Sequence, residues 1–321
     1  MRILFMGTPA YALPALARLY EGGYHLALIV TQPDKPVGRK GTLTPPPVKA
    51  WALEHGLSVF QPKTLRNPDV QETLRAVKPD LIITAAYGKL LPDDVLNIPR
   101  YGALNLHASL LPLYRGAAPI QRAILDGRTE TGVTLMEMVR ELDAGPIIAQ
   151  RTVPIAAKET TGSLTEKLAE VAADLLIEVL PEYVSGRIRS VSQNETRATY
   201  AEKLTRADEA IDLFVESVRI DRRIRALLPA PGGYITVGPA ETDKVKIWAG
   251  EAVSIPPDEQ SAARPGTILA IEKERVALAT QDGVLWLSEV QPAGKKRMTA
   301  ADWVRGRSSW KVGTVIVQKD F

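Results

Sequence analysis

Short apolar runs alternate with segments of helical length through the first part of the chain, and this alternation constrains the fold most strongly. The runs are RILFMGT (2–8), HLALIVT (25–31), SVFQ (58–61), DLIITAAY (80–87) and ALNLHAS (103–109). Nearly continuous apolar strands that are separated by helices are typical of a parallel sheet covered on both faces. We therefore expect an α/β fold with a Rossmann-like, mostly parallel sheet.

The pattern changes towards the C-terminus. Residues 131–139 and 146–155 predict a pair of strands joined by the segment RELDAG, and residues 160–186 predict a long amphipathic helix. The stretch after it is polar and lacks periodicity, whereas the last third has short alternating segments between Gly, Pro and Asp turns, which favours a small antiparallel β-barrel. The predicted organisation is an α/β domain over 1–188, a linker over 189–206 and an OB-like C-terminal β-barrel domain over 207–321.

The composition excludes several kinds of site. The 321 residues include no cysteine, so disulfides, thiolate zinc sites and cysteine nucleophiles are excluded. The three histidines show no H-x-x-H or H-E-x-x-H spacing, so we expect no metal. The opening GTPAYA does not match the dinucleotide fingerprint G-x-G-x-x-G. No apolar run has membrane length, and we expect a cytoplasmic protein without membrane contact.

The charge is nearly balanced, because the formal net charge is only +3. Bulk charge therefore does not indicate a nucleic-acid partner. Basic residues gather locally in RIDRRIR (219–225), GKKRM (294–298) and RGRSSWK (305–311). Such clusters are suited to a phosphate backbone, although any one of them is more often only a solvated surface.

The run ALNLHAS places Asn105 and His107 two residues apart at the end of a predicted strand, so both side chains project from the same face. A carboxamide beside an imidazole can stabilise a developing oxyanion and move a proton. Asp143, in RELDAGPII, is the candidate carboxylate that would orient the imidazole. The alternative is that Asn105 and His107 satisfy backbone groups at a sheet end and that Asp143 merely starts a turn, and spacing alone leaves both interpretations open.

Two long motifs, NLHASLLPLYRGAAPIQRAI and GVTLMEMVRELDAGPI, resemble the folate-dependent formyltransferases. The resemblance extends along the whole chain, through MGTPAYALPAL, TQPDKPVGRK, AYGKLLP, TYAEKLTRADEAIDL and QPAGKKRM, and is greatest to members that act on methionyl-tRNA. It implies that 10-formyltetrahydrofolate donates the formyl group and that the α-amino group of initiator methionyl-tRNA accepts it. The resemblance also implies that Asn105 and protonated His107 stabilise the oxyanion, that Asp143 keeps His107 charged, and that no metal takes part.

The resemblance further implies two binding regions. The residues expected to bind folate are Ser109, Leu110, Leu111, Pro112, Leu90 and Leu91. The residues expected to bind tRNA are Arg39 and Lys40 in the basic loop 33–49, and Arg222, Arg223, Lys295 and Lys296 in the C-terminal domain. Without the resemblance, the leucines would be interpreted as core residues.

Some positions depart from the family's usual pattern. Val139 and Glu141 replace an aspartate and a glycine that often precede the position of Asp143, and LLPAPGGY lacks a frequent tryptophan. A sugar or ribonucleotide N-formyltransferase, a non-catalytic RNA-binding protein and a nucleotide-binding oxidoreductase remain alternative functions. We expect the protein to be a monomer.

Overall fold

The computed structural model describes residues 1–37, 41–238, 243–258 and 262–317, and the chain forms two compact units. The first unit comprises residues 1–120, 129–155 and 164–202. The second comprises residues 121–128 and 156–163 together with the chain from Lys203 onwards. Two short stretches that precede the expected boundary at residue 188 thus pack with the C-terminal part of the chain.

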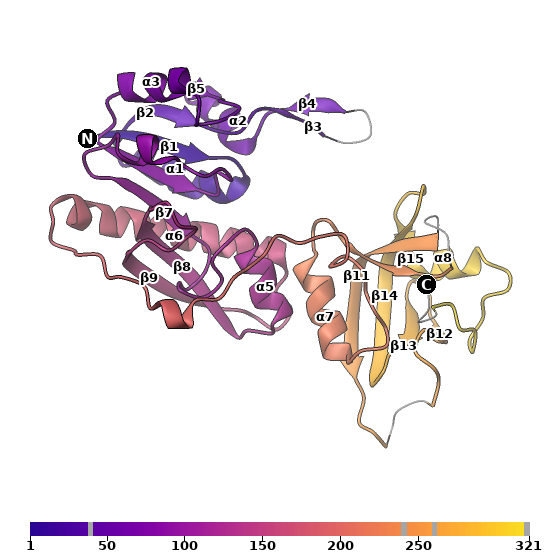
Figure 1. Cartoon of the computed structure of the whole chain (residues 1–321). Coiled ribbons are helices and arrows are strands. Elements are labelled where there is room, and N and C mark those ends of the chain that lie inside the picture. Colours follow the sequence, from indigo (N-terminus) through magenta and orange to yellow (C-terminus); the bar gives the residue numbers. More distant parts are fainter. Residues whose placement is uncertain (38–40, 239–242, 259–261, 318–321) are drawn as a thin grey trace. The chain divides into compact units, whose positions relative to one another are not determined.

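The first unit is built on a seven-stranded sheet, counted over the described residues (Figure 1). Its strands are β1 (Arg2–Gly7), β2 (His25–Val30), β5 (Val59–Phe60), β6 (Leu81–Ala85), β7 (Ala103–His107), β8 (Glu130–Glu137) and β9 (Ile147–Pro154). They lie in the order β5-β2-β1-β6-β7-β8-β9, and only the β7–β8 and β8–β9 pairings are antiparallel. The mostly parallel, Rossmann-like sheet expected from the sequence is confirmed.

The helical segments of the first unit follow the strands in sequence. They are η1 (Ala10–Ala12), α1 (Leu13–Glu21), α2 (Pro47–Glu54), α3 (Pro68–Ala76), α4 (Asp93–Leu96), most of α6 (Thr161–Val184), and η2 (Glu195–Arg197), whereas most of α5 (Pro119–Leu125) belongs to the second unit. Local chemistry explains α3, because the Asn67 side chain accepts from the Asp69 amide and Pro68 occupies the first helical position. A short hairpin, β3 (Lys35–Val37) and β4 (Thr42–Thr44), interrupts a segment that we expected to be a loop.

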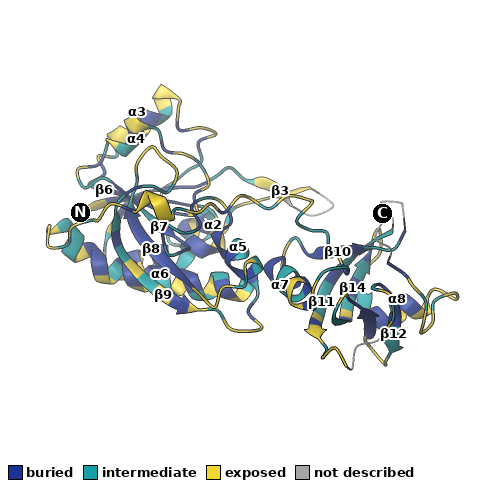
Figure 2. Cartoon of the chain, turned by 60° about the horizontal axis from the view of Figure 1, so that its bottom comes forward, coloured by how far each residue is buried: buried dark blue, intermediate teal, exposed yellow. Residues whose placement is uncertain are grey.

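The parallel strands are buried on both faces, which accounts for their continuous apolar sequences (Figure 2). Phe5, Ile83 and Leu104 are fully buried in three neighbouring strands. The chain reverses its direction of strand addition between β1 and β6, and ligands of open α/β sheets bind near the carboxyl ends of strands at such a point. Both β6 and β7 end on this side of the sheet.

The second unit contains an antiparallel sheet, as expected. Its strands are β10 (Gly233–Thr236), β11 (Lys244–Ser254), β12 (Ile268–Ile271), β13 (Val276–Ala279), β14 (Gly283–Pro292) and β15 (Met298–Thr299). The unit also contains the helices α7 (Ser217–Ala226) and α8 (Ala300–Arg305). Ile220 and Ile224 of α7 are buried in one core with Ile247 and Leu287 of the sheet. Among the described residues, no helix is both long enough and apolar enough to cross a bilayer.

Candidate active site

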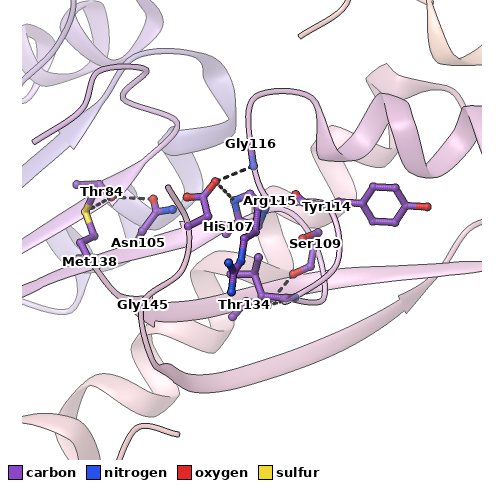
Figure 3. A network of polar contacts seen from close by, with 12 residues as sticks. Thr84, Asn105, His107, Ser109, Tyr114, Arg115, Gly116, Thr134, Met138 and Gly145 are labelled. Atoms are coloured by element: carbon purple, nitrogen blue, oxygen red, sulfur yellow. Dashed lines mark hydrogen bonds and ion pairs between the residues drawn. The ribbon is translucent and has the colours of Figure 1, made fainter. Parts of the chain in front are cut away.

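His107 is the last residue of β7, and its side chain is only 6% exposed. Its Nε2 atom lies 2.9 Å from the carbonyl oxygen of Tyr114 (Figure 3). A carbonyl can only accept, so Nε2 carries the proton in this contact. The other ring nitrogen, Nδ1, lies 3.6 Å from Oδ2 of Asp143. This contact is longer than a hydrogen bond and is an ion pair when the imidazole carries a proton on both nitrogens.

The turn after β7 holds both partners of His107. Tyr114 has φ +61° and Gly116 has φ +117°, so the backbone turns sharply between them. The Gly116 amide donates to Oδ2 of Asp143 at 2.8 Å. A side chain at Gly116 is disfavoured twice, because its φ is in the region that favours glycine and a Cβ would lie 2.9 Å from the Ala201 carbonyl oxygen. The glycine therefore allows both the sharp turn and the close approach of the Ala201 backbone.

Asp143 belongs to the loop after β8, which begins at the amino end of β7, whereas His107 is at the carboxyl end. Because β8 is antiparallel to β7, the loop that follows β8 begins beside the amino end of β7, where the Met138 amide donates to the Ala103 carbonyl. This loop, residues 138–146, then returns to bring Asp143 to the imidazole. Asp143 itself has φ +49°, an uncommon conformation for a residue with a Cβ.

A residue of the neighbouring strand β6 fixes the orientation of the Asn105 side chain. Asn105 lies opposite Thr84 in the β6–β7 register, and the Thr84 hydroxyl donates to its Oδ1 at 2.7 Å. With Oδ1 engaged, the Nδ2 group points to the side of His107 (Figure 3). The carboxamide N–H and the imidazole thus lie on one face, as the two-residue spacing predicts.

Sequence reasoning missed a second layer of polar residues behind these groups. Arg115 is 2% exposed, and its guanidinium binds the Glu195 carboxylate through two hydrogen bonds of 2.7 and 2.9 Å. These bonds lower the pKa of Glu195 and raise the pKa of Arg115. Arg115 also donates to Oε1 of Gln193 at 2.8 and 3.1 Å. A lone arginine in the apolar stretch SLLPLYRGAAP was a signal for a buried ion pair, but the sequence does not identify its partner.

The six residues expected to bind folate differ in their exposure. The Ser109 hydroxyl is fully buried and donates to the Leu113 carbonyl at 2.6 Å, while Leu91 and Leu111 are buried in the core. Leu110 and Pro112 are half-buried, and Leu90 is 65% exposed. The loop 138–146 adds two exposed apolar side chains that the sequence analysis did not select, Val139 and Leu142. Apolar side chains are therefore exposed in the loops after β6 and β8, the two strands beside β7.

The structure describes four of the six residues that are predicted to bind tRNA. Arg39 and Lys40 lie outside the described residues. Arg223 donates to the Ala210 carbonyl at 2.8 Å, and Arg222 lies against Gly127. Lys295 and Lys296 are exposed in the turn after β14.

A further basic surface in the second unit was missed. Lys244, Lys246 and Trp248 alternate along one face of β11, and Trp248 Nε1 donates to the Gln291 carboxamide at 3.0 Å. The Arg297 guanidinium lies 3.8 Å from the centroid of the Trp248 ring. The alternation in KVKIW was a usable signal, because residues two apart in a strand share a face.

The sequence of the chain matches known proteins over its whole length. Residues 1–180 match the family model for formyl transferase, and residues 203–308 match the model for its C-terminal domain. The chain belongs to the formyl transferase family. It is 47% identical to the methionyl-tRNA formyltransferase of Halalkalibacterium halodurans over 100% of this chain and 99% of that one. It is 45% identical to the methionyl-tRNA formyltransferase of Bacillus subtilis, covering 95% and 94% of the two chains.

Solved structures share the fold of this family at lower identity. HypX from Aquifex aeolicus in complex with tetrahydrofolic acid is 22% identical, with a TM-score of 0.64 over 97% of this chain and 48% of that one. This chain therefore spans about half the length of HypX. An N-formyltransferase from Helicobacter canadensis, in complex with folinic acid and dTDP-3-aminofucose, is 17% identical with a TM-score of 0.66, covering 90% and 99% of the two chains. Within the described part of the present chain, no three His, Asp or Glu side chains gather where they could hold a metal ion.

Proposed function

We propose that this protein transfers the formyl group of 10-formyltetrahydrofolate to the α-amino group of initiator methionyl-tRNA, and that Asn105, His107 and Asp143 are its catalytic residues. The observation that carries the proposal is the contact of 3.6 Å between His107 Nδ1 and Asp143 Oδ2, with Asn105 on the same face of β7. Relatives with that activity in their name match the chain from end to end.

The site can stabilise negative charge on the formyl oxygen. As the amine attacks the formyl carbon, the carbonyl oxygen gains charge; Asn105 Nδ2 donates to this oxygen, and the positive charge of protonated His107 beside it stabilises it electrostatically. The new C–N bond forms to the methionyl nitrogen, and the bond to N10 of the folate breaks. The surplus proton of the amine passes to N10, and the His107–Asp143 pair is the titratable group at hand to relay it.

The exposed apolar side chains fit a pterin ring. A flat heteroaromatic ring needs apolar walls and backbone polar groups. Leu90 on one side of β7 and Val139 and Leu142 on the other supply apolar surface. Of the six folate-binding candidates, Leu90 is therefore the one whose side chain is best exposed for contact, whereas Ser109 would act through the loop it holds.

The basic face of the second unit suits the acceptor. Lysines contact phosphates as point charges, and an aromatic ring stacked with an arginine offers a platform for a base or ribose. Lys295, Lys296 and the face around Trp248 provide both elements. We also propose a monomer that acts in the cytoplasm.

Formyl transfer tests the proposal directly. Purified protein is mixed with 10-formyltetrahydrofolate and initiator methionyl-tRNA, with elongator methionyl-tRNA and methionine as control acceptors. Formylation of the initiator tRNA alone is expected. Failure with tRNA, together with transfer to a small amine such as an amino sugar nucleotide, would assign the same site to a different acceptor.

A further inference from the structure

We propose that Gln193 is a positioning residue for Asp143, and that the segment 191–201, here named the bridging segment, fixes both loops of the active site. The inference rests on the proposed function, because it assumes that Asp143 acts on His107. The loops concerned are the histidine loop, residues 108–118, and the aspartate loop, residues 138–146.

The first residues of the bridging segment contact the C-terminal end of the aspartate loop. Val191 and Ile147 exchange two backbone hydrogen bonds of 2.8 Å, which anchors the start of the segment beside β9. Two residues later, Nε2 of Gln193 donates to the carbonyl oxygens of Asp143 and Gly145, each at 2.8 Å. Those two carbonyls flank the turn that carries the catalytic carboxylate.

The same segment contacts the histidine loop with its second half. Thr199 accepts from the Tyr114 amide through its hydroxyl at 2.8 Å and from the Arg115 amide through its carbonyl at 2.8 Å. The Ala201 amide donates to the Arg115 carbonyl at 2.7 Å. The backbone that supplies the Tyr114 carbonyl to His107 is therefore paired with the bridging segment.

Gln193 links the two sets of contacts through one side chain. It is 9% exposed, and all its hydrogen-bonding capacity is used, since Nε2 donates to two carbonyls and Oε1 accepts two bonds from Arg115. The orientation of the carboxamide is unambiguous, because carbonyls only accept and a guanidinium only donates. A buried network whose members are all satisfied holds its geometry firmly.

This hold matters because Asp143 is in an uncommon conformation. At φ +49°, a residue with a Cβ keeps its conformation only where the surroundings impose it. Gln193 restrains the peptide on the C-terminal side of Asp143, and the Gly116 amide restrains its carboxylate. Release of the peptide would let the backbone relax and carry Oδ2 away from the imidazole.

Gln193→Glu tests the donors specifically. The variant keeps the shape and an acceptor for Arg115, but it places an anionic oxygen against two carbonyl oxygens. We expect kcat to fall by about 10- to 100-fold, with the KM values for folate and tRNA changed by less than about threefold, because a misplaced catalytic group lowers the rate rather than the affinity. Gln71→Glu is the matched control, since Gln71 is similarly buried and donates to the Leu65 carbonyl near α3. It should lower the melting temperature without changing kcat.

A double-substitution cycle separates positioning from general destabilisation. If Gln193 acts through Asp143, Gln193→Glu should add little to the loss of kcat caused by Asp143→Asn, whereas independent effects would multiply. Multiplication of the two effects would overturn the proposal, as would full kcat in Gln193→Glu.

Hydrogen exchange gives a readout that needs no substrate. The Gly116 amide should exchange faster in Gln193→Glu than in the wild type, because its acceptor is the Asp143 carboxylate, while amides of β6 remain protected. Unchanged Gly116 exchange would also overturn the proposal. If the wild type formylates no tRNA, the function fails, yet this measurement still decides the positioning.

Glu195→Gln provides a second variant should Gln193→Glu fold poorly. Its carboxylate is 67% exposed, so the substitution is tolerable, and it weakens the ion pair that holds Arg115 against Gln193. A loss of kcat of several-fold with faster Gly116 exchange is expected. No change in either quantity contradicts the inference.

Discussion

Gln193 Nε2 lies 2.8 Å from the carbonyl oxygen of Asp143, and this bond joins two positions fifty residues apart in the sequence. Gln193 belongs to a polar stretch without a periodic pattern of apolar residues, whereas Asp143 belongs to the motif GVTLMEMVRELDAGPI. The contact places part of the support of the candidate site outside the conspicuous motifs. Rate measurements on motif residues alone would therefore miss one of the determinants of the geometry.

Thr84→Val should slow catalysis without contacting the substrate. Valine keeps the shape of threonine but removes the bond of 2.7 Å to Asn105 Oδ1, so the carboxamide loses its fixed orientation. Loss of an oxyanion donor costs about 10²- to 10³-fold in kcat, and we expect Asn105→Ala in that range and Thr84→Val at about tenfold. Steady-state formyl transfer measures both.

Thr73→Val, on the exposed face of α3, is the control for the Thr84 variant and should transfer at the wild-type rate. A Thr84→Val protein that is as fast as the wild type, beside a slow Asn105→Ala protein, would show that Asn105 does not depend on Thr84.

Asp143→Asn should separate the charge of the carboxylate from its structural bond. The asparagine Oδ1 can still accept from the Gly116 amide, so the loop keeps its anchor, but the imidazolium loses its anionic partner. We expect kcat to fall by about 10²- to 10⁴-fold, the range for loss of acid–base assistance. Asp143→Ala removes the anchor as well and should also lower the melting temperature. Equal kcat in the asparagine variant and the wild type would exclude a role for the charge.

Most of the fold was accessible from the sequence because burial dictates the pattern. Parallel strands buried on both faces require continuous apolar runs, and the runs at 2–8 and 103–109 mark β1 and β7 to within two residues. The β3–β4 hairpin was not accessible, since its strands are short and β4 is exposed. When paired strands are exposed to solvent, the pairing places little constraint on which side chains the strands carry.

The candidate site was accessible only in part. Asn105 and His107 share a face through strand periodicity, which the sequence displays. The return of the loop 138–146 depends on β8 running antiparallel to β7, and no local pattern encodes that direction. Arg115, Gln193 and Glu195 meet through a long-range ion pair, so each residue looks like ordinary polar sequence until the fold brings them together.

The salt dependence of tRNA binding should report on the turn after β14. Each lysine that contacts a phosphate contributes up to about 0.9 to the slope of log K against log salt. Replacing both Lys295 and Lys296 with alanine should therefore reduce the slope by up to about 1.8, with kcat at saturating tRNA unchanged. Lys273→Ala, in the exposed β12–β13 turn, serves as the control and should leave the slope as it is. An unchanged slope in the double variant would remove these lysines from the interface.

Acid unfolding should depend on Asp282, which caps helix α7 from the β13–β14 turn. Its Oδ1 accepts from the Ser217 amide and from the Ser217 hydroxyl, each at 2.7 Å, and the helix has no cap of its own at Glu216. Burial by itself raises the pKa of Asp282, but the hydrogen bonds from Ser217 and Ser254 outweigh it, so the pKa lies below its usual value.

The sign of this shift fixes the pH window of the effect. A carboxyl group whose folded-state pKa is lowered stabilises the fold fully above its unfolded pKa, about 3.9, and loses this contribution as the pH falls through the folded-state pKa. Asp282→Asn keeps an acceptor oxygen for Ser217 but removes the charge, so it should reduce the free energy of unfolding at pH 7 by less than the loss of about 1 kcal/mol that is usual when a helix cap is replaced by alanine. The difference from the wild type should shrink below about pH 4, because the unfolded wild-type chain then binds a proton on this carboxyl group that the folded protein binds only at lower pH. Thermal unfolding midpoints between pH 7 and pH 3 measure this convergence, with Asp258→Asn, at an exposed position, as the control. A difference that stays constant down to pH 3 would show that the capping bond, and not the charge, carries the contribution of Asp282.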